Sequence, residues 1–286
     1  MGCLNMTVIS KLTTMIEYAK FGMQMCKAFM LLGNIDETLE LPKGINNLSE
    51  NYTTIHRKFY HVSSKYPIGF NQNTWQQGNH DIKSVRFLKA LNIPPLAFVL
   101  CDYLESVEFP MVETVGDHCF QQCYALTELN LPKARTISQE IIVNSGVKKL
   151  YMPVIENITY ASLRGATALE EAYLESVKVV EGSAFQNCPN LKILMLGKLT
   201  SLSYSFAAST ELEYLGIGKG TTANITLKDQ KKLTKECLLQ IIENYADCTL
   251  LASKPTLTLS QESYELVFDE IVNILTAQKA VNVVVA

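Results

Sequence analysis

The sequence predicts an α/β solenoid, a right-handed stack of short coils between a helical N-terminal segment and a small α/β module. Two similar stretches first indicate a repeat. VEGSAFQNCPNL at 180–191 holds Phe185 and Cys188 among turn-forming Gly, Ser, Asn and Pro residues. VGDHCFQQCYAL at 115–126 has Phe120 and Cys123 in the same relative places. An unusual arrangement that occurs twice indicates a repeated structural unit with a fixed period.

A regular period runs through the middle of the chain. Leucine or valine recurs in steps of 22, 21, 22, 22 and 21 residues, at Leu104, Leu126, Val147, Leu169, Leu191 and Leu212. Apolar residues follow three and five positions later, a spacing that predicts a short strand with alternate side chains pointing inward. Phe120 and Phe185 stand sixteen positions after their leucines, so we expect both to be buried on the return side of a coil. The period predicts five to seven coils over residues 85–220, with 85–103 as a shorter, degenerate first coil.

The repeated units resemble a known family. LESVEFPMVETVGDHCFQQCYA and LEEAYLESVKVVEGSAFQNCPN are similar to BspA-type leucine-rich repeats, which have a leucine strand, Pro, Val-x-x-Ile/Val-Gly and a buried Phe with Cys three residues later. The resemblance covers roughly residues 104–220. Units 126–146 and 147–168 carry Ile142 and Leu163 in place of the Phe and lack the Cys. No special role is therefore expected for the Cys.

Two regions precede the predicted coils. Residues 1–50 are predicted to be a helical segment, since apolar residues over 7–33 have helical spacing and Gly33 ends the pattern. With the following LPKGINNLSE it resembles the segment ahead of the repeats in some bacteriophage tail-associated proteins; a helix that caps the solenoid is the alternative. Residues 51–84 are a polar and aromatic extension, whose composition suits contact with a protein or glycan, although an ordinary ordered loop is also consistent with it. Its candidate partner-binding residues are Tyr60, Tyr66, Phe70 and Trp75.

Residues 221–286 are predicted to be a closing module, which would seal the other edge of the solenoid. Thr234 can cap a helix through 235–246, and Ser260 can cap a helix through about 278. TLTL at 256–259 and VNVVVA at 281–286 predict strands. The sequence resembles the module that follows BspA-type repeats in phage and prophage proteins, except at its end, where QKAVNVVVA replaces a Lys-Gly-Trp-like stretch.

The outward strand positions change character along the solenoid. In the first two coils they are Ser106/Glu108 and Glu128/Asn130, which are polar or acidic. The later coils carry a set that we name the aromatic ladder: Tyr151, Tyr173, Ile193, Met195 and Tyr214. Exposed apolar surface of this kind marks an interface. The ladder is thus a candidate assembly surface, with a homo-oligomer possible, unless the closing module folds back over it.

Other classes of function find no support in the sequence. A net charge of −3 and a pI near 5.9 argue against a nucleic-acid surface. The apolar stretch 21–33 is too short to insert in a membrane and contains Lys27. With no export signal recognised, the eight cysteines are expected to be reduced. No phosphate loop, G-x-S-x-G, H-E-x-x-H or CxxC pair occurs, so no catalytic residue, cofactor site or metal site is predicted.

The resemblances together imply a non-enzymatic binding or structural protein. Its expected setting is a bacteriophage virion, tail- or capsid-associated, where it would serve assembly or host attachment after synthesis in the bacterial cytoplasm without a signal peptide. The partners would be other virion proteins or a host surface protein or glycan. The alternatives are a surface adhesin of the BspA type, located at the cell surface, and an intracellular scaffold. We expect an external partner at the extension and a permanent neighbour, the closing module or another subunit, at the aromatic ladder.

Overall fold

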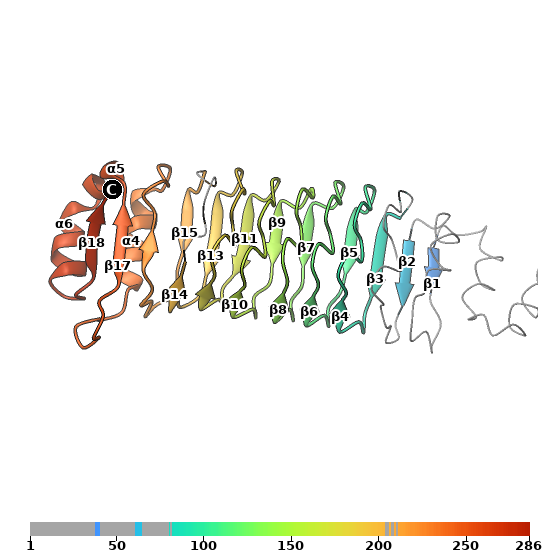
Figure 1. Ribbon diagram of the computed structural model, residues 1–286, viewed down its shortest axis with the longest axis horizontal. Helices are drawn as coiled ribbons and strands as arrows, with labels where there is room; N and C mark the ends of the chain where they lie inside the picture. Colours follow the sequence, from blue (N-terminus) through green and yellow to red (C-terminus); the bar gives the residue numbers. More distant parts are fainter. Residues whose placement is uncertain are drawn as a thin grey trace, which may run out of the picture.

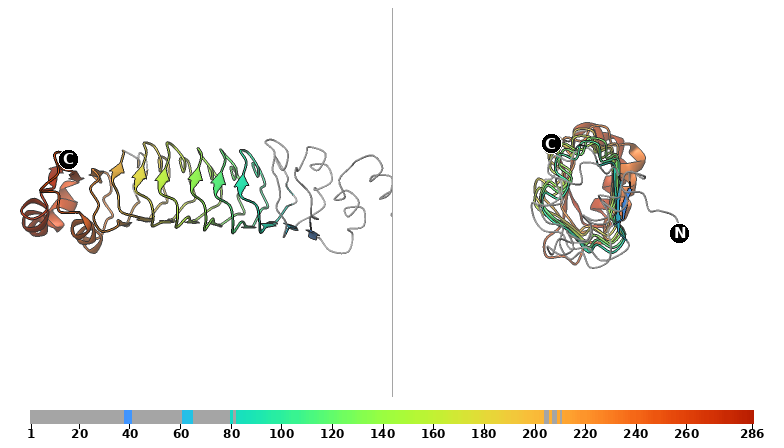
Figure 2. Two further views of the ribbon diagram at one scale, coloured as in Figure 1. Left: turned by 90° about the horizontal axis from the view of Figure 1, so that it is seen from below. Right: turned by 90° about the vertical axis from the view of Figure 1, so that its right-hand side faces the viewer.

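The computed structural model describes residues 38–40, 61–64, 80, 82–203, 206, 209 and 211–286. These residues form a long stack of coils with helices gathered at the C-terminal end (Figure 1). Viewed along the stack, successive coils superpose as a ring (Figure 2). The predicted helix over 7–33 lies outside the described residues.

Parallel strands on one side of each coil form what we call the front face. One sheet has the order β1-β2-β3-β5, made of β1 (Thr38–Glu40), β2 (His61–Ser64), β3 (Ser84–Phe87) and β5 (Ser106–Glu108). A second sheet has the order β15-β13-β11-β9-β7, made of β7 (Glu128–Asn130), β9 (Lys149–Tyr151), β11 (Glu171–Leu174), β13 (Ile193–Leu196) and β15 (Tyr214–Gly216). Because Thr38, His61 and Ser84 are register partners, parallel pairing continues N-terminal to residue 85, the predicted start of the solenoid.

The return side of the coils carries shorter strands. One sheet contains β4 (Asn92–Ile93), β6 (Thr114–Val115) and β8 (Thr136–Ile137), and the next contains β10 (Asn157–Ile158), β12 (Val179–Val180) and β14 (Ser201–Leu202). Inward residues of both sides meet in one continuous core. The predicted parallel solenoid is therefore present.

Phe185 and Phe120 occupy the core, as their place in the repeat predicts, and both are fully buried. The backbone explains how turn-forming residues surround them. The residues two positions before and two positions after the buried side chain have positive φ angles in five successive coils, at Leu96/Leu100, His118/Gln122, Glu140/Asn144, Ala161/Gly165 and Ser183/Asn187. Each pair of left-handed residues bends the chain around one inward side chain, and backbone hydrogen bonds to the next coil hold the bend.

The coil that contains residues 85–103 has the full length of the later coils. The prediction of a shorter, degenerate coil there is therefore wrong. Val85 pairs with Val107 and Ile93 pairs with Val115, both at a spacing of 22 residues. The Phe98 ring stacks on Phe120 with centroids 5.3 Å apart. The leading position holds Ile82 instead of leucine, and it is fully buried. The leucine pattern that begins at Leu104 did not reveal this coil, because Ile82 stands at the position where the later coils have leucine or valine.

The C-terminal helix α4 (Lys235–Asn244) takes the place beside β15 that another front strand would occupy. It begins at the predicted cap, since the Thr234 side chain accepts a hydrogen bond from the Cys237 N–H. Gln240 and Asn244 donate side-chain hydrogen bonds to the Ile217 carbonyl at 3.2 and 2.8 Å. These bonds satisfy a backbone acceptor at the end of β15.

The rest of residues 221–286 continues the parallel stacking. Strand β16 (Ile225–Thr226) pairs with β17 (Thr256–Leu259), which pairs with β18 (Asn282–Val285). Ser260 caps α5 (Gln261–Leu266), and the side chain accepts a hydrogen bond from the Ser263 N–H. The helix predicted to run to about 278 is interrupted at Val267, where φ is −132°, and resumes as α6 (Phe268–Glu270) and the π-helix η2 (Ile271–Thr276).

Candidate functional site

The structure brings the aromatic ladder together on the front face. Tyr151, Tyr173 and Met195 are register partners in one column, and Ile193 pairs with Tyr214 in the adjacent column. The rings of Tyr151 and Tyr173 stack with centroids 4.9 Å apart and an interplanar angle of 3°. All five side chains are half-buried. The helices lie beyond β15 at the end of the stack (Figure 1), so the module does not fold back over these strands.

Charged groups hold one side of the ladder in place. The Tyr173 hydroxyl donates to Glu171 Oε2 at 2.7 Å, and Lys149 Nζ lies 3.0 Å from Glu171 Oε1. The hydrogen bond from Tyr173, followed by that from Lys149, lowers the pKa of the Glu171 carboxyl. The same hydrogen bonds to Glu171 raise the pKa of both the Tyr173 hydroxyl and the Lys149 ammonium. Glu171 therefore stays ionised and fixes the Tyr173 ring.

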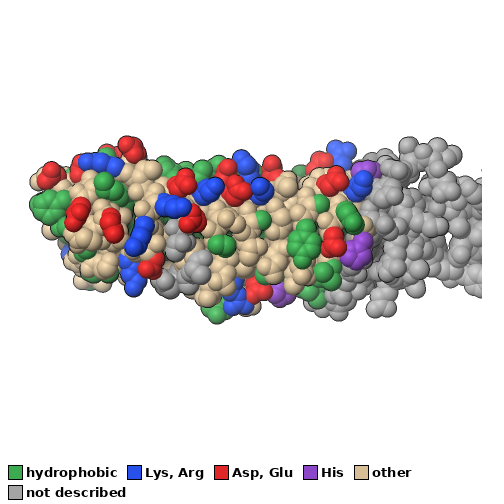
Figure 3. Space-filling model, turned by 90° about the horizontal axis from the view of Figure 1, so that it is seen from above, with side chains coloured by type: hydrophobic (Ala, Val, Ile, Leu, Met, Phe, Trp, Pro, Cys, Tyr) green, Lys and Arg blue, Asp and Glu red, His purple; other side chains and the backbone are tan. Residues whose placement is uncertain are grey.

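The N-terminal part of the front face is polar. Ser106, Glu108, Glu128 and Asn130 are exposed, and Glu108 forms an ion pair with Arg86 of the preceding coil. Ion pairs between coils also occur elsewhere, such as Lys178 with Glu156 at 2.9 Å. Figure 3 shows acidic and basic side chains interleaved along one long face of the described residues. The aromatic ladder thus differs from the polar and charged outward positions of β5 and β7.

The buried thiols do not form a reactive site. Cys123 and Cys188 are free and buried, and burial raises the pKa of each thiol to about 12. Their sulfurs donate to the carbonyls of Phe98 and Leu163 at 3.0 and 3.2 Å. His118 Nδ1 lies 3.5 Å from the Glu140 carboxylate of the next coil. These cysteines are packing residues, because a thiol with so high a pKa has little thiolate to act as a nucleophile.

The described residues include neither a cluster of metal-ligating side chains nor a helix able to span a membrane. They contain no group of three or more His, Cys, Asp or Glu side chains placed to hold a metal ion. Within the same ranges, no helix has the length and apolar character needed to cross a membrane. The predicted partner-binding residues Tyr60, Tyr66, Phe70 and Trp75 lie outside the part of the chain that the structure describes.

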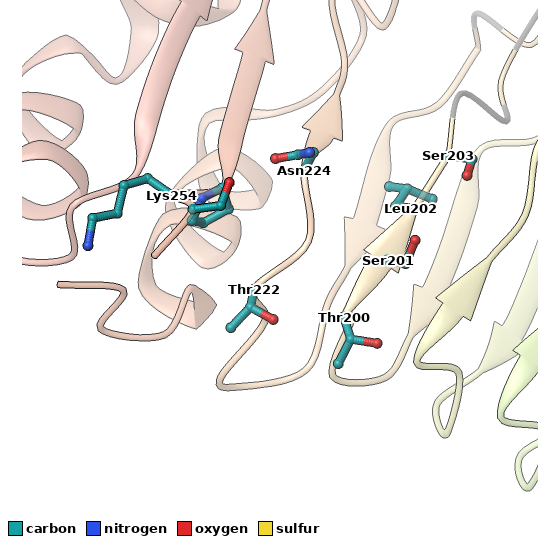
Figure 4. Close-up of a pocket in the computed structure, with 9 residues that line it drawn as sticks. Thr200, Ser201, Leu202, Ser203, Thr222, Asn224 and Lys254 are labelled. Carbon is teal, nitrogen blue, oxygen red and sulfur yellow. The ribbon is translucent and has the colours of Figure 1, made fainter. Parts of the chain in front are cut away.

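Sequence reasoning missed a polar cavity of about 430 Å³ on the return side of the last coil. It lies between β14, β16 and the segment before β17 (Figure 4). Its walls come from three separate stretches of chain. No local motif marks it, since Ser, Thr and Asn residues in each stretch read as ordinary turn residues.

Comparisons with known proteins agree with the observed architecture. Residues 91–219 match, in six copies, the family model described as "BspA type Leucine rich repeat region". No curated protein sequence is significantly similar to the chain. The structure of the TLR13–ssRNA13 complex is similar with 17% identity and a TM-score of 0.54, over 85% of this chain and 40% of that one. The chain therefore spans about two fifths of the length of that relative.

Two bacterial proteins give weaker structural matches. A leucine-rich repeat protein from Bacteroides ovatus has 15% identity and a TM-score of 0.31, with coverage of 87% and 83% of the two chains. The T. pallidum leucine-rich repeat protein has 12% identity and a TM-score of 0.29, with coverage of 72% and 82%. The family match and the likeness to the TLR13 chain show the fold alone, a leucine-rich repeat solenoid with parallel sheets.

Proposed function

We propose that the protein is a non-enzymatic binding protein that docks a protein on its aromatic ladder. The observation that carries this proposal is the set of five half-buried apolar side chains in register across four neighbouring strands of an open sheet face. Aromatic residues and Met are enriched in interface cores, whereas Glu, Asp and Lys are depleted there. Solenoids present extended surfaces that suit this use.

The geometry of the ladder favours a pre-organised contact. The stacked rings of Tyr151 and Tyr173 already have a fixed orientation, so little side-chain freedom remains to be lost on binding. Lys149 and Glu171 form an ion pair at the edge of the stacked rings. Polar residues at the rim of an interface exclude water from its centre, and this pair has such a position. The permanent neighbour we propose is a second subunit of this chain.

The proposed setting is a bacteriophage virion, with the protein tail- or capsid-associated in assembly or host attachment. Support comes from the flanking segments, which resemble modules around BspA-type repeats in phage proteins. A surface adhesin or an intracellular scaffold of the BspA type is the alternative. Mass spectrometry of purified phage particles and of host envelope fractions separates these settings. Detection only in the envelope would contradict the virion assignment.

Self-association tests the role of the ladder. Tyr173→Glu combined with Ile193→Lys places two charges in the proposed interface, where an unpaired buried charge is costly. We expect sedimentation velocity to show oligomers of the unaltered chain and monomers of this variant. The matched control, Ser106→Glu with Glu108→Lys, introduces the same two residues at outward positions of strand β5, which has no register partner in the ladder, and should still self-associate. A folded ladder variant that assembles normally contradicts the proposal.

We assign the external partner to the extension. Trp75→Ala with Tyr66→Ala should leave the circular dichroism spectrum unchanged. It should weaken binding to a virion protein or host surface by about 2 kcal/mol or more if these residues are hot spots. Normal binding by this variant, measured by surface plasmon resonance, removes the extension from the proposed contact.

A further inference from the structure

The cavity on the return side lies where the stacking of strands is interrupted. Among the described strands, β14 ends one sheet and β16 begins the next, so no ladder of hydrogen bonds joins them. Between the described residues of these coils, the backbone bond nearest the cavity runs from the Thr222 N–H to the Leu199 carbonyl at 2.8 Å. Next to that bond lies a cavity of about 430 Å³, a volume within the usual range for small-molecule sites.

Three stretches of chain form the walls of the cavity (Figure 4). They are residues 200–203 on and beside β14, Thr222 and Asn224 ahead of β16, and residues 253–255 ahead of β17. The third wall is fixed in position. Lys254 Nζ donates to the carbonyls of Cys248 and Thr249 at 2.6 and 2.5 Å. The Thr256 N–H donates to Asn224 Oδ1 at 2.8 Å and ties the third wall to the second.

The described lining residues are mostly polar and include no acid. Five of these nine have hydroxyl side chains: Thr200, Ser201, Ser203, Thr222 and Ser253. Asn224 uses its carbonyl oxygen for the Thr256 N–H, so its amide nitrogen keeps two donors for a ligand. The Lys254 ammonium is bound by two carbonyls, and Figure 4 shows it directed away from Thr200 and Thr222. Thr200 Oγ1 already donates to the Lys178 carbonyl at 3.2 Å, so towards a ligand this hydroxyl accepts. The cavity therefore offers the Asn224 amide as a donor and hydroxyl oxygens as acceptors.

The geometry points to a binding site for a neutral saccharide. Vicinal hydroxyls of a sugar both donate and accept hydrogen bonds, so they can pair with the hydroxyl oxygens and the Asn224 amide of the lining. Leu202 and Pro255 are the apolar members of the lining and can contact the C–H face of a pyranose ring. An inorganic anion would lack a cationic partner here, since Lys254, the one basic side chain among the described lining residues, is bound to carbonyls of its own loop.

This site is separate from the aromatic ladder. The ladder lies on strands β9, β11, β13 and β15, whereas the cavity lies beside β14 and β16, which belong to other sheets. A protein bound to the front face does not need the cavity. Saccharide binding at the cavity and protein binding at the ladder can therefore be tested independently.

Amide NMR of the full chain tests the site with defined probes: maltotriose, N,N′-diacetylchitobiose, cellobiose and, separately, inorganic phosphate. We expect at least one saccharide to shift the amide signals of residues 200–203 and 222–224, and phosphate to leave them unchanged. Ser253→Trp fills the cavity from an exposed position and should weaken saccharide binding by about tenfold or more. Thr136→Trp, at an exposed position of β8, is the matched control and should bind as the unaltered chain does.

Three results would overturn the proposal. They are the absence of shifts with every saccharide, shifts at the cavity with phosphate alone, and full saccharide affinity in a folded Ser253→Trp variant. Circular dichroism establishes that both Trp variants fold. Monomeric or oligomeric behaviour of the chain has no bearing on these outcomes, so failure here is distinguishable from failure of the ladder.

Discussion

The polar half of the front face, on β5 and β7, and the aromatic half, on β9 to β15, share one backbone design. Their strands are parallel, and each contributes inward residues to the same core. Leu129 of β7 and Leu194 of β13 are both fully buried. Outward, Glu128 and Asn130 are exposed, whereas Tyr151 and Tyr173 are half-buried against each other. The inward side chains form the core of each coil, whereas the outward side chains can vary and are available for contact with a partner.

This difference has a physical cause. An inward position has one environment, so only apolar side chains of suitable volume fit it. An outward position faces solvent and tolerates charge, as in the Arg86–Glu108 pair, or an aromatic stack. Surface residues away from the core contribute little to stability. Packing in the core therefore does not explain the aromatic residues clustered at such positions, and the proposed contact is placed there for this reason.

The largest expected effect tests whether the two halves are alike inside. Leu129→Ala and Leu194→Ala each remove a fully buried side chain, and each should lower the free energy of unfolding by about 2–5 kcal/mol. Urea denaturation followed by circular dichroism measures both values. A loss in only one half would contradict the shared design of the core.

A smaller effect should distinguish the halves on the outside. In a double-mutant cycle, Tyr151→Ala and Tyr173→Ala should show a coupling free energy of about 0.5–1.5 kcal/mol from the stacked rings. The matched cycle on the polar half uses Glu108→Ala and Asn130→Ala and should show a weaker coupling. Equal coupling in the two cycles would mean that stacking does not set the aromatic half apart.

The periodic part of the fold could be predicted from the sequence because each inward position repeats. The register pairs Glu171 with Ile193 and Tyr173 with Met195, which are the columns that the period predicts. The caps Thr234 and Ser260 were also identified, since each precedes an apolar helical pattern. Burial of Phe185 followed from its position in the unit, in spite of its turn-rich surroundings.

Other features depend on contacts that a linear pattern does not contain. Ile82 serves as the leading leucine of a full coil, and nothing local distinguishes it from a loop residue. The interruption at Val267 arises within a segment that has a continuous helical pattern. The polar cavity exists only because Thr200, Thr222 and Ser253, from three separate stretches of chain, lie around the same space. The sequence predicted which positions form the ladder. The stacking of the Tyr151 ring on the Tyr173 ring could be seen only in the structure.

The smallest expected effect concerns how the ladder is held. Glu171 has a pKa lowered from 4.5, first by the hydrogen bond from Tyr173 and then by that from Lys149. Because the folded-state pKa lies below the unfolded value, the stability contributed by Glu171 is present above the unfolded pKa. It is lost as the pH falls through the folded pKa. We therefore expect the aromatic half to loosen in acid, below the ordinary pKa of glutamate.

Tyr173→Phe isolates the first cause, since it keeps the ring and removes the hydroxyl that donates to Glu171. Carboxyl NMR of Glu171 should show its titration midpoint rising towards the ordinary glutamate value, while the ion pair with Lys149 keeps part of the lowering. Tyr151→Phe is the matched control, because it retains both the stacked ring and the Tyr173 hydroxyl, and it should leave the midpoint unchanged. An unchanged midpoint in Tyr173→Phe would assign the lowering to Lys149 alone. The ladder would then be oriented by ring stacking without help from the carboxylate.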